Sequence, residues 1–236
     1  MKKWILRIIT VIVVVCILTG TFFIGKGYVM YSAALKECSL EDNIQSIRAG
    51  KNYATLEELP KMYLDAVVAV EDHRYYNHGA IDILSIGRAM WVNLTSLRLV
   101  EGGSTITQQL AKNIYFTQEK KLERKIAETF MAFTLESQYE KDQILELYVN
   151  TIYFGSGYYG VYDASQGYFG KAPSEMTDYE STLLAGLPNA PSVYSPDVNP
   201  ELSAQRHQMV LARMMDCDYI TEEEAQTIMA NYHVNP

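Results

Sequence analysis

The chain has 236 residues, of which 48% are hydrophobic, and its 20 Lys and Arg against 28 Asp and Glu give a net charge of −8. This hydrophobic content is enough for a folded core, so an intrinsically disordered or collagen-like chain is excluded. An acidic chain lacks the basic surface that a general nucleic-acid binder needs, so we expect no nucleic-acid partner. Three cysteines are too few for a disulfide framework.

The N-terminal residues predict a membrane anchor. The first 26 residues carry four basic and no acidic side chains, whereas the rest of the chain holds 16 basic and 28 acidic ones. Residues 8–24 contain no charge and have the ~20-residue length scale of a transmembrane helix. The preceding basic residues place the N-terminus in the cytoplasm and the chain after Lys26 outside. A cleaved signal peptide would need small residues after a shorter apolar region, whereas Phe22 and Phe23 continue it.

The remaining sequence predicts a mainly α domain. Residues 27–58 show no strong period and are expected to be a juxtamembrane linker. Apolar periodicity, prolines and a capping box at Thr221 and Glu224 predict helices that follow it. These helices begin at Pro60 and at about residues 83, 106, 120, 141, 180 and 221, and the 141–149 helix ends in the tight glycine-rich loop 151–160. In the 120–139 helix the expected apolar face is Leu122, Ile126, Phe130 and Phe133.

The motif AVEDHRYYNHG places two adjacent carboxylates at the end of an apolar helix. Glu71 and Asp72 run directly into Tyr75, Tyr76 and His78. Burial of a carboxylate beside aromatic groups raises its pKa, which suits a general acid or base. A helix end with solvated acids explains these residues equally well, and an isolated histidine is more often a hydrogen-bonded loop residue than a catalyst.

The motif EGGSTITQQLAKN combines a glycine-rich loop with a polar helix. Free N–H groups at the helix N-terminus favour phosphate or another anion, and Lys112 adds a positive charge. The paired amides of Gln108 and Gln109 suit sugar hydroxyls. A simple turn in which Ser104 or Thr105 caps the helix accounts for the hydroxyls but not for the two glutamines.

The motif KKLERKIAE places Arg124, Lys125 and Glu128 opposite the expected apolar face of its helix. An ordinary ion pair on a solvated face, contributing ~0.3–0.5 kcal/mol, is the simplest explanation. However, residues 98–125 hold six basic and three acidic side chains within a strongly acidic external domain. Such concentrated positive charge indicates an anionic ligand, and Glu128 among cations is expected to stay ionised, unlike Glu71.

Six ordered motifs resemble the glycosyltransferase domain of class A penicillin-binding proteins, and more closely the monofunctional peptidoglycan glycosyltransferases. They are AVEDHRYYNHG, GGSTITQQLAKN, RKIAE, KDQILELYVNTIYFG, YFGK and LAGLPNAPSVYSP. The resemblance implies a lysozyme-like, two-lobed α fold over residues 59–236, behind the anchor (1–26) and the linker with the start of the external domain (27–58). It also implies an apolar patch that dips into the outer leaflet. We expect no penicillin-binding transpeptidase domain, because no sequence remains for one.

The resemblance further implies polymerisation of lipid II into β-1,4-linked peptidoglycan strands, with inversion and release of undecaprenyl diphosphate. Glu71 matches the general base for the acceptor 4-hydroxyl. Glu128 matches a second glutamate that assists the departing diphosphate, directly or through Mg²⁺ or Mn²⁺, although no spacing here identifies metal ligands. The matching substrate-binding positions are Asp72, His78, Ser104, Thr105, Gln108, Gln109, Lys112, Asn113, Lys120, Arg124 and Lys125.

The chain departs from the family pattern at two positions. Tyr75 replaces a common Phe, and Lys120 replaces a frequent Arg, which removes the planar fork for bidentate phosphate contacts.

The first alternative function is a lysozyme-like hydrolase or lytic transglycosylase, which also uses two carboxylates. Such an enzyme has no diphosphate for a basic cluster to neutralise. The second alternative function is that of an inactive, membrane-tethered glycan-binding protein. The expected partners are lipid II, the lipid-linked growing glycan, the membrane and other cell-wall synthesis proteins.

Overall fold

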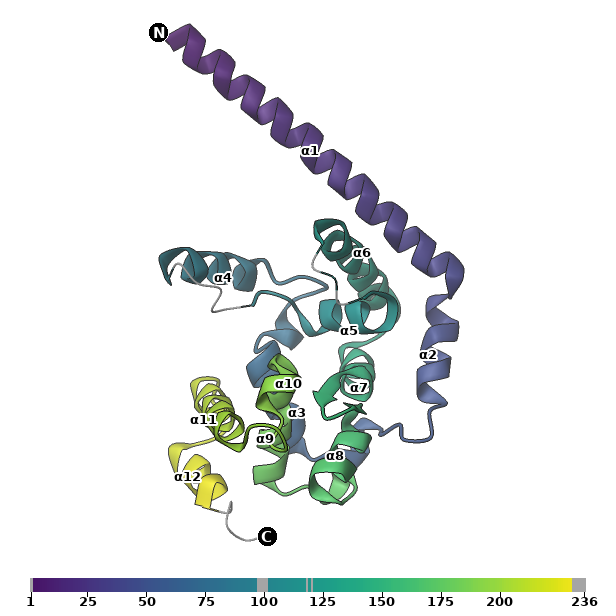
Figure 1. The fold of residues 1–236 in the computed structure, drawn as a ribbon, viewed down its shortest axis with the longest axis vertical. Coiled ribbons are helices and arrows are strands. Elements are labelled where there is room, and N and C mark those ends of the chain that lie inside the picture. Colours follow the sequence, from purple (N-terminus) through teal and green to yellow (C-terminus); the bar gives the residue numbers. More distant parts are fainter. Residues whose placement is uncertain (1, 97–101, 118, 120, 231–236) are drawn as a thin grey trace.

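The computed structural model describes residues 2–96, 102–117, 119 and 121–230. Helices dominate this part of the chain, together with one antiparallel hairpin (Figure 1). In chain order the elements are α1 (Lys2–Glu37), α2 (Leu40–Arg48), η1 (Leu56–Glu58), α3 (Lys61–Glu71), η2 (Tyr75–Asn77), α4 (Ile83–Ser96), α5 (Ile106–Tyr115), α6 (Leu122–Gln138), α7 (Lys141–Thr151), β1 (Tyr153–Gly155), β2 (Tyr158–Tyr159), α8 (Val161–Phe169), η3 (Pro173–Glu175), α9 (Asp178–Gly186), η4 (Leu187–Asn189), α10 (Pro191–Tyr194), α11 (Pro200–Asp216) and α12 (Glu222–Ala230).

The N-terminal helix α1 extends beyond the anchor expected from the sequence. Its stretch Lys3–Glu37 is long and apolar enough to cross a membrane. The helix continues for eleven residues past Lys26, and α2 follows after a short break. The segment 27–58 is therefore mostly helical, although its sequence shows no strong period, because the last turns of α1 pack along α6 (Figure 1).

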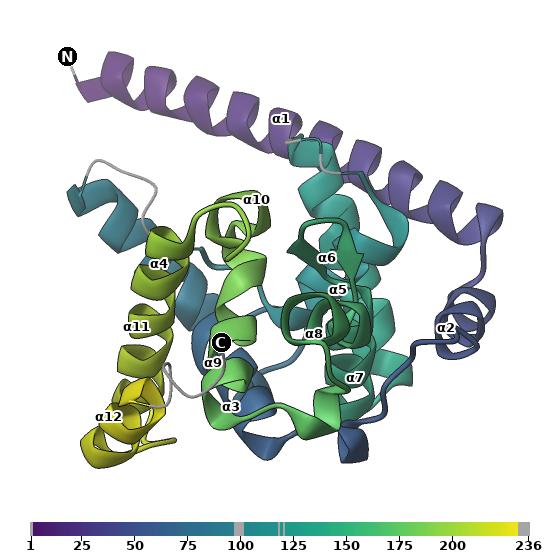
Figure 2. The same ribbon diagram turned by 60° about the horizontal axis from the view of Figure 1, so that its bottom comes forward.

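The helices pack into two groups (Figure 2). In one group α5 packs against α6 and α7, with α1 along α6 and α2 against α7. In the other group α3, α9 and α11 pack together, and α12 joins α9 and α11. α8 contacts both α7 and α9 and so links the groups. The expected mainly α, two-lobed architecture behind one apolar N-terminal helix is confirmed.

The helix α6 packs on two sides: its predicted apolar face meets α1, and a different side enters the core. Leu122 is 56% exposed and Phe133 is 51% exposed, while Ile126 and Phe130 contact α1. The side that enters the core carries Ala127, Glu128, Met131, Ala132 and Leu135. An apolar stripe that packs on a second helix outside the core has the same periodicity as a core stripe, so the sequence does not distinguish the two partners.

The hairpin β1–β2 is a tight turn that requires glycine at its ends. Gly155 has φ +94°, and a Cβ there would lie 2.6 Å from the carbonyl oxygen of Pro191. Gly160 has φ +80°, and a Cβ there would lie 2.7 Å from the carbonyl oxygen of Asn150. Only glycine combines this backbone conformation with so close an approach. The hairpin is thereby held between the end of α7 and α10, as a tight loop of the kind predicted for residues 151–160.

Helices α9 and α11 meet around a buried histidine. The His207 Nε2 lies 2.7 Å from the Thr182 hydroxyl, and the imidazole packs edge-on against Tyr179 with ring centroids 4.6 Å apart. His207 is 1% exposed, and burial lowers its pKa to about 4. The ring is therefore neutral at pH 7, and the packing of α11 on α9 depends on that neutral form.

We expect the free energy of unfolding to fall at acidic pH because of His207. Its pKa is about 6.5 in an unfolded chain and about 4 in the fold, so the unfolded state binds the proton more tightly. The stabilisation is complete above the unfolded pKa and is lost as pH falls toward the folded pKa, with an upper value of about 3 kcal/mol. Thermal unfolding of wild type and His207→Gln across this pH window would test it, and equal pH slopes would contradict it.

Candidate active site

Glu71 ends α3 at the place where the two helix groups meet. The amide Nε2 of Gln109, on α5, donates a hydrogen bond to Glu71 Oε2 at 2.8 Å. The hydroxyl of Tyr148 lies 3.4 Å from Gln109 Oε1 and donates to it. Glu71 Oε1 is buried and has no hydrogen-bond partner among the described residues. One carboxylate oxygen is thus held in place, and the other is buried without a partner in the described part of the chain.

Burial raises the pKa of Glu71 above its ordinary value. The hydrogen bond from Gln109 and the positive charges of Arg206 and Lys112 act in the opposite direction, whereas the neighbouring Asp72 raises the pKa further. The direction expected from the sequence is confirmed. A carboxylate with a raised pKa and an unpartnered oxygen is suited to accept a proton near neutral pH.

Asp72 connects the loop after α3 to the start of α5. Its Oδ2 accepts a hydrogen bond from the Ile106 backbone N–H at 3.1 Å, and its Oδ1 lies 2.7 Å from His78 Nε2. The other ring nitrogen of His78 lies 2.6 Å from the Gly79 carbonyl oxygen. Both side chains are almost fully buried. They position α5 beside Glu71, and the substrate-binding role that the resemblance implies for them stays a prediction.

Thr105 and Gln108 form a capping box at the start of α5. The Thr105 hydroxyl accepts from the Gln108 backbone N–H at 3.1 Å and donates to the Ala80 carbonyl at 2.8 Å. The Gln108 amide accepts from the Thr105 N–H and donates to the Thr129 hydroxyl. With Asp72 accepting from the next N–H, protein groups engage three N–H groups at this helix start, and the anion site expected there stays a prediction. Gln108 is buried and lines neither cavity described below.

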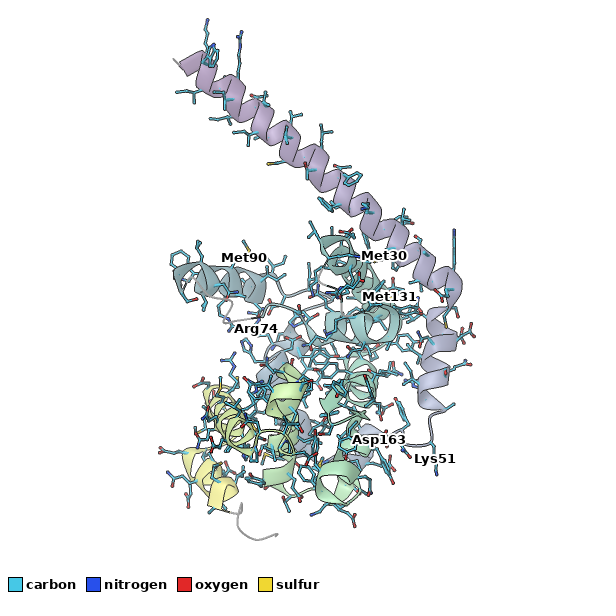
Figure 3. All side chains as sticks on the ribbon, viewed as in Figure 1. Met30, Lys51, Arg74, Met90, Met131 and Asp163 are labelled. Atoms are coloured by element: carbon cyan, nitrogen blue, oxygen red, sulfur yellow. The ribbon has the colours of Figure 1, made fainter. Side chains whose placement is uncertain are left out.

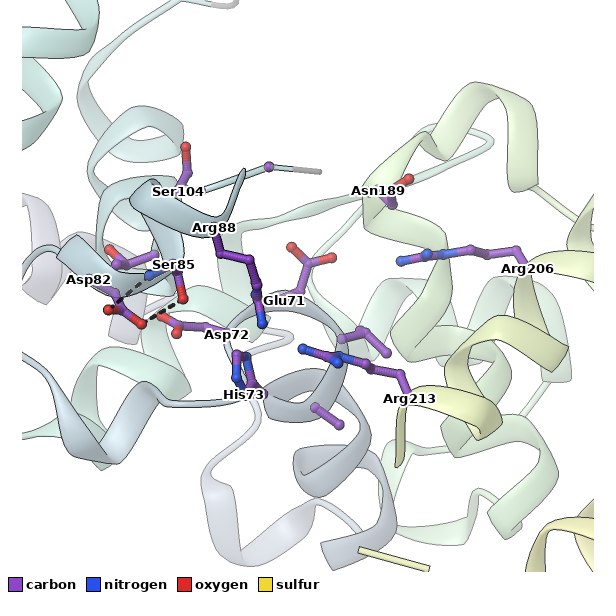
Figure 4. Close-up of a pocket in the computed structure, with 15 residues that line it drawn as sticks. Glu71, Asp72, His73, Asp82, Ser85, Arg88, Ser104, Asn189, Arg206 and Arg213 are labelled. Carbon is purple, nitrogen blue, oxygen red and sulfur yellow. Dashed lines mark hydrogen bonds between the residues drawn. The ribbon is translucent and has the colours of Figure 1, made fainter. Parts of the chain in front are cut away.

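A cavity of about 250 Å³ opens beside Glu71 (Figure 4). Arg88 from α4 and Arg206 and Arg213 from α11 extend toward it, and Figure 4 shows them around the Glu71 carboxylate. The Arg206 Nε donates to the Gly186 carbonyl at 2.9 Å, which holds that side chain across the cavity. Ser104, Thr105 and Asp72 also line it.

Sequence analysis did not identify these three arginines as site residues. Arg206 and Arg213 are seven residues apart in one helix, so their shared face was an available signal. Arg88 lies in an apolar helix segment that carries no such pattern. Only the packing of α4 and α11 around the end of α3 brings the three guanidinium groups together.

A second cavity, of about 500 Å³, lies on the other side of the Glu71–Gln109 hydrogen bond. Its wall includes the packed rings of Tyr153 and Tyr159, whose centroids are 4.7 Å apart. Asn189 borders both cavities. The residues that line the second cavity are Gln109, Lys112, Asn113, Thr151, Ile152, Tyr153, Tyr159, Pro188, Asn189 and Pro191.

On α6, Arg124 and Lys125 both pair with Glu128. Arg124 Nη1 contacts Glu128 Oε1, and Lys125 Nζ lies 3.2 Å from Glu128 Oε2. Glu128 is 1% exposed, whereas the side chains of Arg124 and Lys125 are 13% and 41% exposed, so only the carboxylate end of these ion pairs is fully buried. Lys125 Nζ also donates to the Ser104 hydroxyl at 2.7 Å. Because Ser104 lines the cavity beside Glu71, this cationic side of α6 adjoins the same site.

The lysines of the site have depressed pKa values. Burial, followed by the positive charges of Arg124 and Lys112, lowers the pKa of Lys125 to about 8. Burial and Arg124 also lower the pKa of Lys112, whereas Glu71 raises it. Lys112 therefore lies within electrostatic reach of both the Glu71 carboxylate and the α6 cations. Lys120, which the resemblance assigns to phosphate binding, lies outside the described residues.

Asp72, His78 and Asp82 form the one group of three carboxylate and imidazole side chains, within the described ranges, whose ligand atoms lie within 4.8 Å of one another. Protein groups already engage these atoms. His78 contacts Asp72, and Asp82 accepts from the Ser85 hydroxyl at 2.6 Å and pairs with Arg74 at 3.1 Å. Because the Arg74 guanidinium already pairs with the Asp82 carboxylate, these three side chains do not fit a resident Mg²⁺ or Mn²⁺ site.

A family model described as transglycosylase matches residues 41–215. The chain belongs to this family. The match begins within the segment 27–58, ahead of the domain start predicted at residue 59. The motif-based resemblance to a peptidoglycan glycosyltransferase domain is confirmed.

Several curated relatives have similar sequences. Penicillin-binding protein 1A of Aquifex aeolicus is 48% identical over 172 residues, which cover 73% of this chain and 24% of that protein. Penicillin-binding protein 1A of Vibrio cholerae is 40% identical over 96% of this chain and 29% of its own length. A putative transglycosylase of Cupriavidus necator is 40% identical over 81% of this chain and 83% of its own length.

Among solved structures, penicillin-binding protein 1A from Haemophilus influenzae matches with a TM-score of 0.45 and 27% identity, over 75% of this chain and 17% of that chain. The chain thus spans about a quarter of the length of the curated penicillin-binding proteins it matches.

Proposed function

We propose that this domain polymerises lipid II into β-1,4-linked glycan strands and releases undecaprenyl diphosphate. The observation that carries the proposal is the Glu71 carboxylate, which lines a cavity with three arginines and is held by Gln109, a residue of the second cavity beside Lys112. The reaction needs a base for a sugar hydroxyl and positive charge for two lipid diphosphates. Family membership supports the same reaction class.

Glu71 acts as the general base in this proposal. Its Oε1 takes the proton of the acceptor 4-hydroxyl as that oxygen attacks the anomeric carbon of the donor, and the bond to the donor diphosphate breaks with inversion. The Gln109 amide holds Oε2, so the carboxylate keeps one orientation while Oε1 accepts the proton. Because the attacking sugar shields the site from water, desolvation keeps the carboxylate basic.

The cationic side chains stabilise the phosphates on the two sides of the reacting carbon. We assign the donor diphosphate to Lys112 and to the Arg124 and Lys125 pair, which Glu128 orients through its two carboxylate oxygens. The cavity with Arg88, Arg206 and Arg213 takes the second anionic group. A hydrolase of uncharged linkages would gain nothing from this concentration of positive charge around Glu71, so the transferase is favoured over the hydrolase.

The membrane supplies the substrate in this proposal. The helix α1 spans it with the N-terminus in the cytoplasm and the domain outside, as the basic residues before the apolar stretch predict. α4 presents a second apolar surface on the side of the domain that α1 occupies, and Met90 projects from it (Figures 1 and 3). Its most exposed apolar side chains are Ile83, Leu84, Met90, Trp91 and Leu94. This surface suits contact with lipid.

We expect Glu71→Gln to reduce lipid II polymerisation by roughly 10²–10⁴-fold, the range for loss of a general base. The amide has nearly the same shape and needs no charge in a buried site, so the melting temperature should not fall. Glu224→Gln, the same chemical change in the capping box of α12, is the matched control. The assay measures lysozyme-sensitive polymer from labelled lipid II, and unchanged yield from Glu71→Gln would favour a glycan-binding protein without catalysis.

Polymerisation should show a bell-shaped pH profile. Activity rises with pH as Glu71 ionises, at a pKa above the usual value for Glu, and falls as Lys125 loses its proton at about pH 8. Lys125→Arg keeps the positive charge at high pH and should move the alkaline limb upward by at least about one pH unit. Lys61→Arg, at the exposed first residue of α3, is the control, and an unmoved limb in Lys125→Arg would contradict the assignment.

We also propose that Mg²⁺ or Mn²⁺ enters as a complex with the donor diphosphate, since the described residues lack a fitting resident site. Magnesium is commonly held by substrate phosphates with few protein ligands. Polymerisation should therefore fall in excess chelator and return when Mg²⁺ or Mn²⁺ is restored. Full activity at saturating chelator would remove the divalent cation from the mechanism.

A further inference from the structure

The side of α6 that faces away from the site packs along the last turns of α1. Lys26 Nζ lies 3.5 Å from Glu123 Oε1, at the first turn of α6. Farther along both helices, the hydroxyls of Tyr31 and Thr134 lie 2.8 Å apart. The Tyr31 ring also packs on Phe130, with centroids 5.8 Å apart. Both helices advance in the same direction through these contacts, so the two form a continuous seam.

Gly27 is the point of closest approach in this seam. It is buried, alone among the residues of α1 whose side chains the structure describes. A Cβ at this position would lie 2.5 Å from Ile126 Cγ2, 2.7 Å from Ile126 Cβ and 3.0 Å from the Glu123 carbonyl oxygen. Because the Ile126 Cβ is attached directly to the backbone, a side-chain rotation cannot relieve the clash, and the two helices would have to separate.

The opposite side of α6 carries the cationic residues of the site. At 100° per residue, Arg124 and Glu128 each lie about 200° around the helix from Ile126. Glu128 is buried against α6's own cations, and Lys125 reaches Ser104 at the cavity. A displacement of the α6 backbone at Ile126 therefore moves the residues that adjoin Glu71, since a helix turn shifts as a unit.

We propose that the last turns of α1 are a positioning element for the site: through Gly27, the membrane helix fixes α6 and with it Arg124, Lys125 and Glu128. The anchor then does more than retain the domain at the membrane. It sets the distance of the cationic side of α6 from the bilayer in which the lipid diphosphates lie. The role in activity rests on the proposed glycosyltransferase function, whereas the α1–α6 contact does not.

The test compares Gly27→Leu with Gly25→Leu in the full chain, reconstituted in lipid nanodiscs. A Cβ at Gly25 meets nothing within 4 Å, so the control adds the same side chain to the same helix without touching α6. We expect Gly27→Leu to lower kcat/KM for lipid II by about tenfold or more and Gly25→Leu to change it less than about twofold. Equal effects of the two substitutions would overturn the proposal.

A compensating pair separates positioning from general damage. Gly27→Ala introduces the clash, and a second substitution, Ile126→Gly, removes the Cβ that it meets, so the pair moves the small residue from α1 to α6. We expect the pair to recover activity relative to Gly27→Ala alone, after comparison with Ile126→Gly by itself in a double-mutant cycle. Activity of the pair no better than the product of the two single effects would overturn the proposal.

Hydrogen exchange of the α6 backbone gives a readout that does not depend on catalysis. Amide exchange over residues 126–134 should accelerate in Gly27→Leu, stay at the wild-type rate in Gly25→Leu and recover in the compensating pair. Unchanged exchange in Gly27→Leu would show that α1 does not hold α6. If wild-type protein made no polymer, the proposed function would fail, while the exchange pattern would still decide whether α1 positions α6.

Discussion

The hydrogen bond between Gln109 and Glu71 joins the two helix groups at the candidate active site. Glu71 belongs to α3 and Gln109 to α5, so this contact exists only when the groups are packed together. A buried carboxylate with a single donor carries a desolvation cost, which is expressed as its raised pKa. The positive charges of Arg206 and Lys112 offset part of that cost. The carboxylate is thus held on one oxygen, while the other is buried without a hydrogen-bond partner among the described residues.

Two helices, α5 and α6, hold that arrangement. α5 is fixed at its start by Asp72 and by the Thr105 capping box, and it then presents Gln109 and Lys112 to the second cavity. α6 carries Glu128 and its cationic partners on the side toward the site and contacts α1 on the other. The site is thus connected through one helix width to the element that enters the membrane.

Much of this could be predicted because the relevant signals are local. The charge-free stretch in residues 8–24, the carboxylate pair at the end of an apolar helix and the Arg124 to Glu128 spacing are all consequences of neighbouring residues. Apolar periodicity predicted α3 to α7 and α9 for the same reason, and the capping box at Thr221 and Glu224 is present, whereas α2, α8 and α11 were not predicted. A local pattern does not say which partner it meets: the apolar stripe of α6 packs on α1, and side chains of the α5 start bond to neighbouring backbone groups.

The sequence by itself determined the membrane-spanning length of α1, the mainly α domain and the acidic and basic residues available for chemistry, since these depend on composition and short-range spacing. Only the tertiary structure decided that Arg88, Arg206 and Arg213 surround Glu71, because they come from helices distant in the chain. It also decided that residues 27–37 stay helical. Their stability comes from contact with α6, and a contact between distant segments leaves no period in either one.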